Sequence, residues 1–305
     1  MRITPNITIN NSLHNIQTSR ALLDSIQEKI ASGKNYNRIS DDPVMARLLV
    51  GINDRFGANE QYRSNISKAN IWLKMTSTTL DGMAATMKEV KSLIGTIPID
   101  NNDPTTRNNI AYQLTLMREQ LADMGNTQLE NQYIFSGTDT TTQPYNRAVQ
   151  DPPVAGDYQG NSAVTKVQID FNATETMNIP GSDVLGGGTP PPARVDILKE
   201  LDTLIATLKA GPISASDRTT YANLMEQGAQ QIQTAQVTAA TRVKRLDLMS
   251  KMLDNTKNTL ETVFSNVQNA DYAKLGVELS QQKAAFEATL SSTAKISQMS
   301  LLDYL

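Results

Sequence analysis

The residues that could do chemistry are few, and their spacing does not suit it. The chain has no cysteine and a single histidine, His14. Without cysteine there are no disulfides, no thiolate nucleophile and no cysteine zinc site. General acid–base catalysis by imidazole would depend on His14 alone. We therefore expect no catalytic residue, no metal site, no cofactor and no enzymatic activity.

Two short motifs could be taken for functional sites. Asp41-Asp42 is a carboxylate pair, but Pro43 follows it. An Asp directly before a Pro is a typical helix start, and adjacent residues at a helix cap do not converge on one ion. Gly33-Lys34 lacks the upstream glycine and the Ser/Thr of a phosphate-binding loop. We interpret Asp41-Asp42 as a helix cap and Gly33-Lys34 as a turn between helices.

Charge and hydropathy exclude two further classes of partner. The net charge is −3 and the pI is near 5.3, so no basic surface is expected for nucleic acid. No apolar stretch approaches the ~20 residues that a membrane-spanning helix requires, so we expect no membrane insertion. The segment Met1–Asn6 has no apolar core of a signal peptide. If the protein is secreted, we expect this to occur without a cleaved signal peptide.

Glycine and proline, which interrupt helices and strands, are concentrated in one region of the chain. Residues 137–192 contain 7 of the 16 glycines and 7 of the 12 prolines. Within this region Val167, Ile169 and Phe171 alternate with polar residues, and Met177–Ile179 does so again, which predicts two short strands. We therefore expect a small β-rich domain, residues 138–192, inserted between helical segments.

Apolar residues on either side repeat with a spacing of seven. The series from Met45 to Ile97 has apolar residues at thirteen of its sixteen positions, and the series from Met225 to Val267 at ten of thirteen. Such repeats predict long helices packed at a shallow angle, each on the order of 60 to 80 Å. Asp42-Pro43 and Asp103-Pro104 are expected to start helices, and Gly211-Pro212 to separate a short helix from a long one.

The two chain ends carry apolar stripes of their own. We expect the first helix to pair with the last and the leftover apolar surface to face other copies of the protein. A two-helix unit buries little area, so these helices should order fully only on assembly. The predicted assembly interface consists of Ile9, Leu13, Ile16, Leu23, Ile30, Leu275, Leu279, Phe286, Leu290, Leu301, Leu302 and Leu305.

The predicted fold is mainly α: an elongated, coiled-coil-like helical bundle built from both chain ends, with the β-rich domain inserted in its middle. We expect three parts. Residues 1–40 with 271–305 form a terminal helical region, residues 41–137 with 193–270 form a long-helix rod, and residues 138–192 form the insert.

Four separated motifs resemble the bacterial flagellin and hook-associated protein family. Ile30–Lys34 together with Ser40, Asp41, Asp42 and Pro43 is similar to its N-terminal signature. Tyr133–Thr138 followed by Pro144-Tyr145 resembles the junction with the small β domain, and Ser300–Leu305 resembles the C-terminus. Pro43 and the ending at Leu305 are more similar to the hook-associated protein 3 (FlgL) type than to flagellins.

The resemblance implies a structural subunit of the bacterial flagellum at the hook–filament junction, between FlgK and the flagellin filament. It also implies extracellular location after type III flagellar export, self-assembly in a ring and binding of a FlgN-type export chaperone. In the assembled axis the terminal region would form an inner tube and the insert an outer domain.

Three alternatives remain open at this point. The first is a filament-forming flagellin, which would assemble through its terminal helices in the same way. A secreted hydrolase or sugar-binding module could use the insert as its active part, carried on a helical stalk. A cytoplasmic signalling bundle is the third, against which the Gly- and Pro-rich insert argues.

Overall fold

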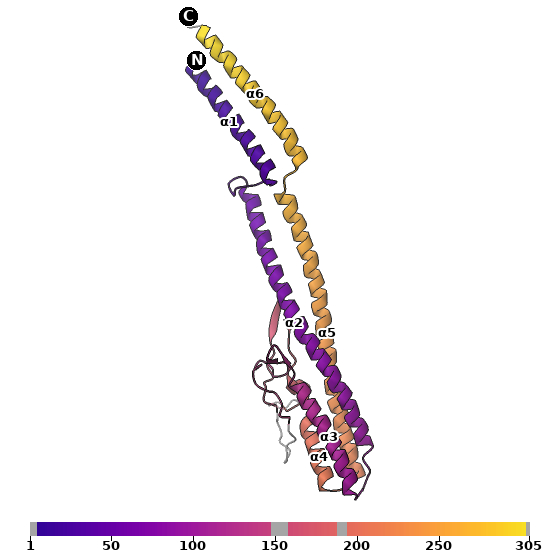
Figure 1. Cartoon of the computed structure of the whole chain (residues 1–305). Coiled ribbons are helices and arrows are strands. Elements are labelled where there is room, and N and C mark those ends of the chain that lie inside the picture. The colour runs from indigo at the N-terminus through magenta and orange to yellow at the C-terminus, as the bar shows by residue number, and fades with distance from the viewer. Residues whose placement is uncertain (1–4, 148–157, 188–193, 303–305) are drawn as a thin grey trace. The chain divides into compact units, whose positions relative to one another are not determined.

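The computed structural model describes residues 5–147, 158–187 and 194–302 (Figure 1). They are mainly helical, with two short hairpins and irregular backbone between the third and fourth helices. The helices are α1 Pro5–Ser32, α2 Pro43–Gly95, α3 Pro104–Gly125, α4 Ile197–Ala210, α5 Ala215–Gln268 and α6 Tyr272–Leu302. The strands are β1 Gln128–Leu129, β2 Gln132–Tyr133, β3 Lys166–Asp170 and β4 Ala173–Thr176. The prediction of a mainly α fold with a small β-containing segment in its middle is confirmed.

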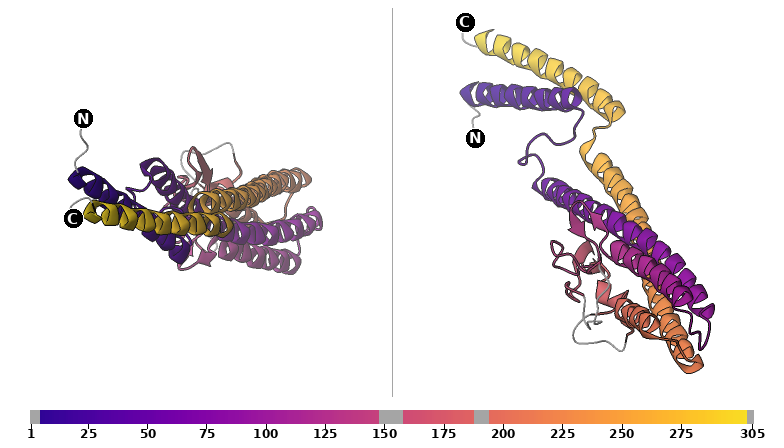
Figure 2. Two further views of the ribbon diagram at one scale, coloured as in Figure 1. Left: turned by 90° about the horizontal axis from the view of Figure 1, so that it is seen from above. Right: turned by 60° about the horizontal axis from the view of Figure 1, so that its bottom comes forward.

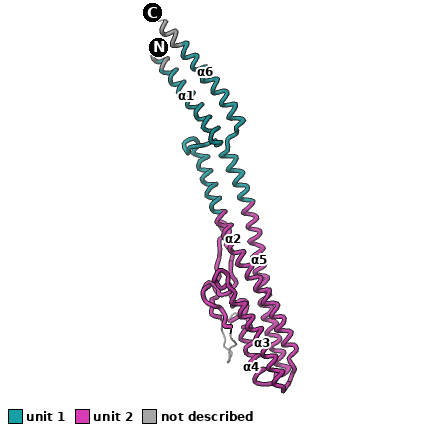
Figure 3. Tube along the Cα trace, in the orientation of Figure 1, with its two compact units in different colours: residues 1–58, 255–305 teal, residues 59–254 magenta. Residues whose placement is uncertain are grey.

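The chain forms two compact units, coloured separately in Figure 3. Unit 1 consists of residues 1–58 and 255–305, and unit 2 of residues 59–254. The helices α2 and α5 each contribute residues to both units. The three-part division expected from sequence places its boundaries elsewhere and stays a prediction.

The seven-residue repeats form the core of unit 2. In α2 the side chains of Leu73, Leu80, Met87 and Ile94 are fully buried. Polar contacts join the two long helices beside this seam: the Asn70 amide lies 2.8 Å from the Asp247 carboxylate, and Arg63 pairs with Asp254 at 3.1 Å. The buried partners from α5 in unit 2 are Met225, Ile232, Ala235, Ala239, Leu246 and Leu253.

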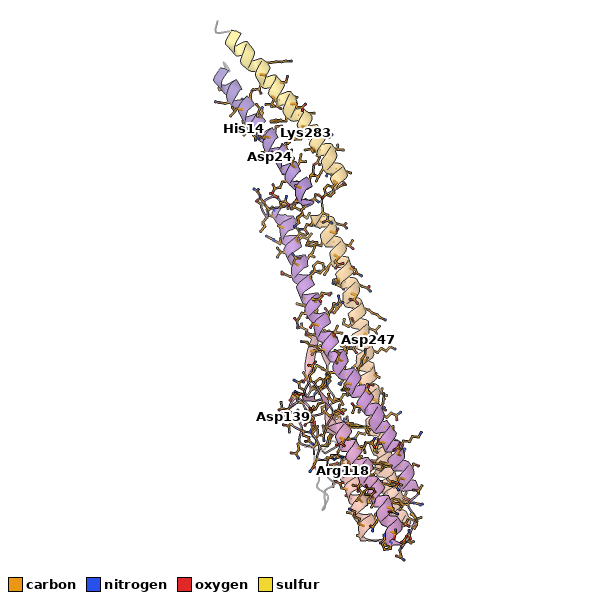
Figure 4. All side chains as sticks on the ribbon, in the orientation of Figure 1. His14, Asp24, Arg118, Asp139, Asp247 and Lys283 are labelled. Carbon is orange, nitrogen blue, oxygen red and sulfur yellow. The ribbon has the colours of Figure 1, made fainter. Side chains whose placement is uncertain are left out.

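The short helices α3 and α4 pack on each other and share a buried ion pair. Arg118 of α3, labelled in Figure 4, is fully buried, and Asp202 of α4 is 1% exposed. Two guanidinium nitrogens of Arg118 lie 3.0 and 3.1 Å from the Asp202 carboxylate oxygens. The third nitrogen donates to the carbonyls of Asn146 and Arg147, at 2.7 and 2.8 Å. One side chain therefore connects two helices and the segment that follows Tyr145.

The middle segment shares the core of the helices. Phe135, Tyr145 and Tyr158 are buried in one cluster with residues of α2, α3, α4 and α5. The Tyr145 ring packs so closely on Gly125 that a Cβ there would lie 2.6 Å from the ring. Burial raises the pKa of Tyr158, and its hydroxyl donates to the Phe135 carbonyl at 2.7 Å.

Gly137 explains part of the Tyr133–Thr138 motif. Its φ is +78°, and a Cβ at this position would collide with the Asn161 backbone carbonyl. Only glycine adopts this conformation without cost and leaves room for that approach.

The predicted strands are correct in part. Val167 and Ile169 lie in β3, but the strand ends at Asp170, and Phe171 lies in the turn to β4, 78% exposed. A register shift between Gln168 and Asp170 ends the alternation that placed Phe171 on the buried face.

The second predicted strand, Met177–Ile179, is wrong, since β4 is Ala173–Thr176. The Asn178 side chain takes over the bonds that a ladder would supply: it accepts from the Thr165 amide at 2.8 Å and donates to the Gly137 carbonyl at 3.0 Å.

Sequence reasoning missed the β1–β2 hairpin. Its two turn residues, Glu130 and Asn131, have positive φ angles of 51° and 62°. Two-residue hairpins favour this conformation, but Glu is not among the residues that signal it.

The buried pair gives a direct test. Arg118→Met leaves the Asp202 charge buried without its partner, which should lower the free energy of unfolding by about 3 to 5 kcal/mol. The double variant Arg118→Met/Asp202→Leu should be less destabilised than Arg118→Met alone, because no unpaired charge remains. Urea unfolding followed by circular dichroism measures both. A single variant within about 1 kcal/mol of the parent would contradict the role given to this pair.

Candidate assembly surface

The two chain ends form a helix pair in unit 1. The helices α1 and α6 run side by side in opposite directions in Figure 1 and in the right-hand view of Figure 2, and they are in contact. The expected pairing of the first helix with the last is thus present in the structure.

The face between α1 and α6 is partly polar. Ser12 and Ser19 of α1 are only 8% and 9% exposed. The Gln282 amide of α6 donates to the Ser19 carbonyl and hydroxyl, at 3.2 and 3.0 Å. Small hydroxyl residues therefore occupy contact positions where a stable coiled coil would carry leucine or isoleucine.

Large apolar side chains lie on the outside of the same pair. Leu13 is 55% exposed and Leu22 53% exposed on α1, and Val277 is 59% exposed on α6. Ile7 at 51% and Leu290 at 43% belong to the same set. An arrangement with serine inside and leucine outside leaves apolar surface available for another chain.

The predicted interface residues divide between the two faces. Leu13 and Leu290 are exposed, whereas Leu275 is buried. Ile9, Leu301 and Leu302 lie within helices but their side chains are not described, and Leu305 lies outside the described residues. The half-buried members are Ile16, Leu23, Ile30, Leu279 and Phe286.

The segment Ser40–Pro43 starts α2. Asp42 accepts hydrogen bonds from the amides of Val44 and Met45, both at 3.0 Å, and Pro43 is the first helical residue, where a missing N–H costs nothing. The Asp41 carboxylate accepts from the Arg38 amide at 2.9 Å, and this bond lowers the pKa of Asp41. Ser40 is exposed in the turn.

The two linkers of unit 1 are paired with each other. Gly33 ends α1 with a φ of +68°. Lys34 and Asn269 then form an antiparallel bridge, in which the Asn35 amide donates to Gln268 at 2.8 Å and the Ala270 amide to Gly33 at 3.0 Å. Sequence reasoning predicted only a turn at Gly33-Lys34, because no local pattern links residues more than 230 positions apart.

The described residues show neither a metal-binding cluster nor a membrane span. Among them no three His, Asp or Glu side chains gather where an ion could bind, and none of the described helices is apolar over the length that a bilayer requires. His14, labelled on α1 in Figure 4, is exposed.

Comparison with known proteins identifies the N-terminal part. The sequence model of the family described as the bacterial flagellin N-terminal helical region matches residues 3–140. Residues 3–140 are thus similar to a flagellin N-terminal helical region. The match confirms the resemblance found in the N-terminal motifs. No curated protein sequence matches the chain.

Solved hook-associated proteins share the fold. A protein of Vibrio parahaemolyticus described as a flagellar hook-associated protein has a TM-score of 0.62 at 23% identity, over 75% of this chain and 100% of its own. Hook-associated protein 3 of Legionella pneumophila has a TM-score of 0.59 at 12% identity, over 71% of this chain and 98% of its own. FlgL of Xanthomonas campestris has a TM-score of 0.56 at 13% identity, over 70% of this chain and 99% of its own. The chain thus shares the fold of these hook-associated proteins.

The polar contact face predicts a gain of stability on substitution. In Ser19→Leu, an apolar side chain would replace a serine at an α1–α6 contact position. Partial burial of leucine should stabilise the helix pair by about 1 kcal/mol, which is about fivefold slower hydrogen exchange in α1 and α6. The matched control is Ser25→Leu at an exposed position of the same helix. Equal exchange in both variants would show that Ser19 does not limit the pairing.

Proposed function

We propose that the protein is the junction subunit between the hook-side protein FlgK and the flagellin filament. The observation that carries this is the helix pair of unit 1, with serines between α1 and α6 and Leu13 and Leu22 outside. Such a pair gains stability when neighbouring copies cover these exposed apolar side chains. The fold shared with hook-associated proteins favours the role of a junction subunit over that of a filament subunit.

The proposal assigns a place to each part of the chain. Residues 1–40 with 271–305 form the inner tube of a ring of identical subunits, residues 41–137 with 193–270 form the rod, and residues 138–192 form the outer domain. The terminal helices order fully on assembly, because the pair alone buries too little apolar area to offset its chain entropy.

Export completes the proposal. The subunit leaves the cell through the flagellar type III apparatus without a cleaved signal peptide, escorted by a FlgN-type chaperone, and becomes part of the extracellular flagellum. The absence of cysteine suits a chain that passes unfolded through a channel and folds outside, since no disulfide has to form.

Deletion of the gene in its source bacterium tests the junction role. We expect bare hooks in negative-stain electron micrographs and flagellin lost to the medium. Normal filaments would refute the proposal. Loss of the major flagellin band itself would instead identify the chain as the filament subunit, the second candidate function.

A substitution of one exposed apolar residue tests the assembly surface in the same strain. Leu13→Asp should fail to restore filaments, because it places a charge where another copy must pack. Its effect on the folded chain should stay within about 0.5 kcal/mol, since Leu13 is exposed. The matched control Asn11→Asp adds the same charge at an exposed polar position on another face of α1 and should restore filaments. Equal filament numbers with both variants would remove Leu13 from the interface.

A further inference from the structure

An apolar groove in unit 1 has no occupant in the chain's described part. It lies between α2 and α5, has a volume of about 580 Å³, and is lined by Leu48, Ile52, Leu260 and Val263 among others. Leu48 is 44% exposed and Val263 38% exposed. The volume is that of a site for a bulky group, within the range of ligand pockets.

The groove carries positive charge and no negative charge. Arg47 and Arg55 line it, and none of its nine lining residues is acidic. Within the described residues neither arginine forms a hydrogen bond or ion pair. An occupant with an apolar side chain next to a carboxylate would match both properties of the groove.

The tip of the β3–β4 hairpin in unit 2 has this composition. Phe171, at 78%, is the most exposed large apolar side chain of the described residues. Asp170 directly precedes it. A phenylalanine so exposed contributes nothing to the core of its own unit and offers a large apolar surface to another molecule.

The tip is also held in place before binding. The Phe171 amide donates to the Asp170 carboxylate at 2.8 Å, and the Gln168 side-chain amide donates to the Phe171 carbonyl at 3.1 Å. The Asn65 amide of α2 donates to the Gln168 carbonyl at 2.8 Å and fixes the hairpin on the helix. A rigid tip loses little entropy when it binds, which favours its use as an anchor.

Another aromatic residue next to an acid is already engaged. Tyr272 follows Asp271 and is 60% exposed, but its hydroxyl lies against Gly33, where an added Cβ would be 2.7 Å from it. The Asp271 carboxylate accepts from the amides of Ala273 and Lys274 at the start of α6. Tyr272 therefore belongs to the structure of unit 1, whereas the Phe171 tip is free.

We propose that Phe171 of one copy inserts into the groove of a second copy, with Asp170 facing Arg47 and Arg55. The hairpin tip and the groove are different surfaces of the same chain, so the contact is heterologous. Such a contact repeats from copy to copy, as a ring or helical array requires. The inference rests on the proposed self-assembly in the flagellum and adds a specific contact to it.

Cysteine cross-linking tests the contact, because the chain has no cysteine of its own. Two variants with different epitope tags, Phe171→Cys and Leu48→Cys, are produced together in the deletion strain. Flagella are purified and mildly oxidised. We expect a disulfide-linked product of two chains that carries both tags, since a disulfide requires Cα atoms within about 7 Å. Each chain has one cysteine, so this product can form only between copies.

The matched control replaces Leu48→Cys by Ile71→Cys, an exposed apolar position of α2 in unit 2. It should give no product with both tags. A product equally abundant with both partners, or no such product in flagella that contain both variants, would overturn the contact alone. Absence of both variants from the flagella would overturn the proposed function as well.

Charge reversal tests the electrostatic part. Adding Arg47→Glu and Arg55→Glu to the Leu48→Cys chain should reduce the cross-linked product about fivefold. Adding Asp170→Arg to the Phe171→Cys chain should then restore it, because the charges are again opposite. No loss with the first change, or no recovery with the second, would overturn the pairing of Asp170 with the groove.

Discussion

The apolar seam of the long helices is the constraint on which the rest of unit 2 depends. Leu73, Leu80 and Met87 of α2 face the buried residues of α5, and both helices keep this alignment for many turns. The helices α3 and α4 share a buried core with α2 and α5, and residues of the middle segment are part of the same core. The irregular backbone of the middle segment is therefore stabilised by a helical core and needs no large sheet of its own.

The buried Arg118 shows how an irregular segment can be fixed by a helix. Its guanidinium has five donors in a rigid plane, which suits a carboxylate on one side and two backbone carbonyls on another. The carbonyls of Asn146 and Arg147 would otherwise have to find partners elsewhere. A lysine would supply the charge but not the geometry.

The sequence predicted what depends on periodicity and on local signals. The seven-residue repeats gave the long helices, and Asp103-Pro104 gave the start of α3, where the Asp103 carboxylate accepts from two amides. Features that depend on distant partners were not predictable. Asn178 replaces a strand by side-chain bonds, and Arg118 and Asp202 meet across 84 positions, although a charge among the apolar residues of both helices was a visible signal. On α1 the apolar pattern marked the right helix, but it could not show that serines lie inside and Leu13 outside.

The paired linkers of unit 1 have a mechanical consequence. Tension along the chain would be shared by two covalent strands, 33–35 and 268–270, rather than concentrated in one. Their backbone hydrogen bonds lie across the direction of such a pull. These hydrogen bonds resist sliding of one strand past the other, and the load does not stretch the hydrogen bonds themselves. In the proposed junction role, torque from a rotating filament would extend both linkers together, and the two terminal helices would move as one body.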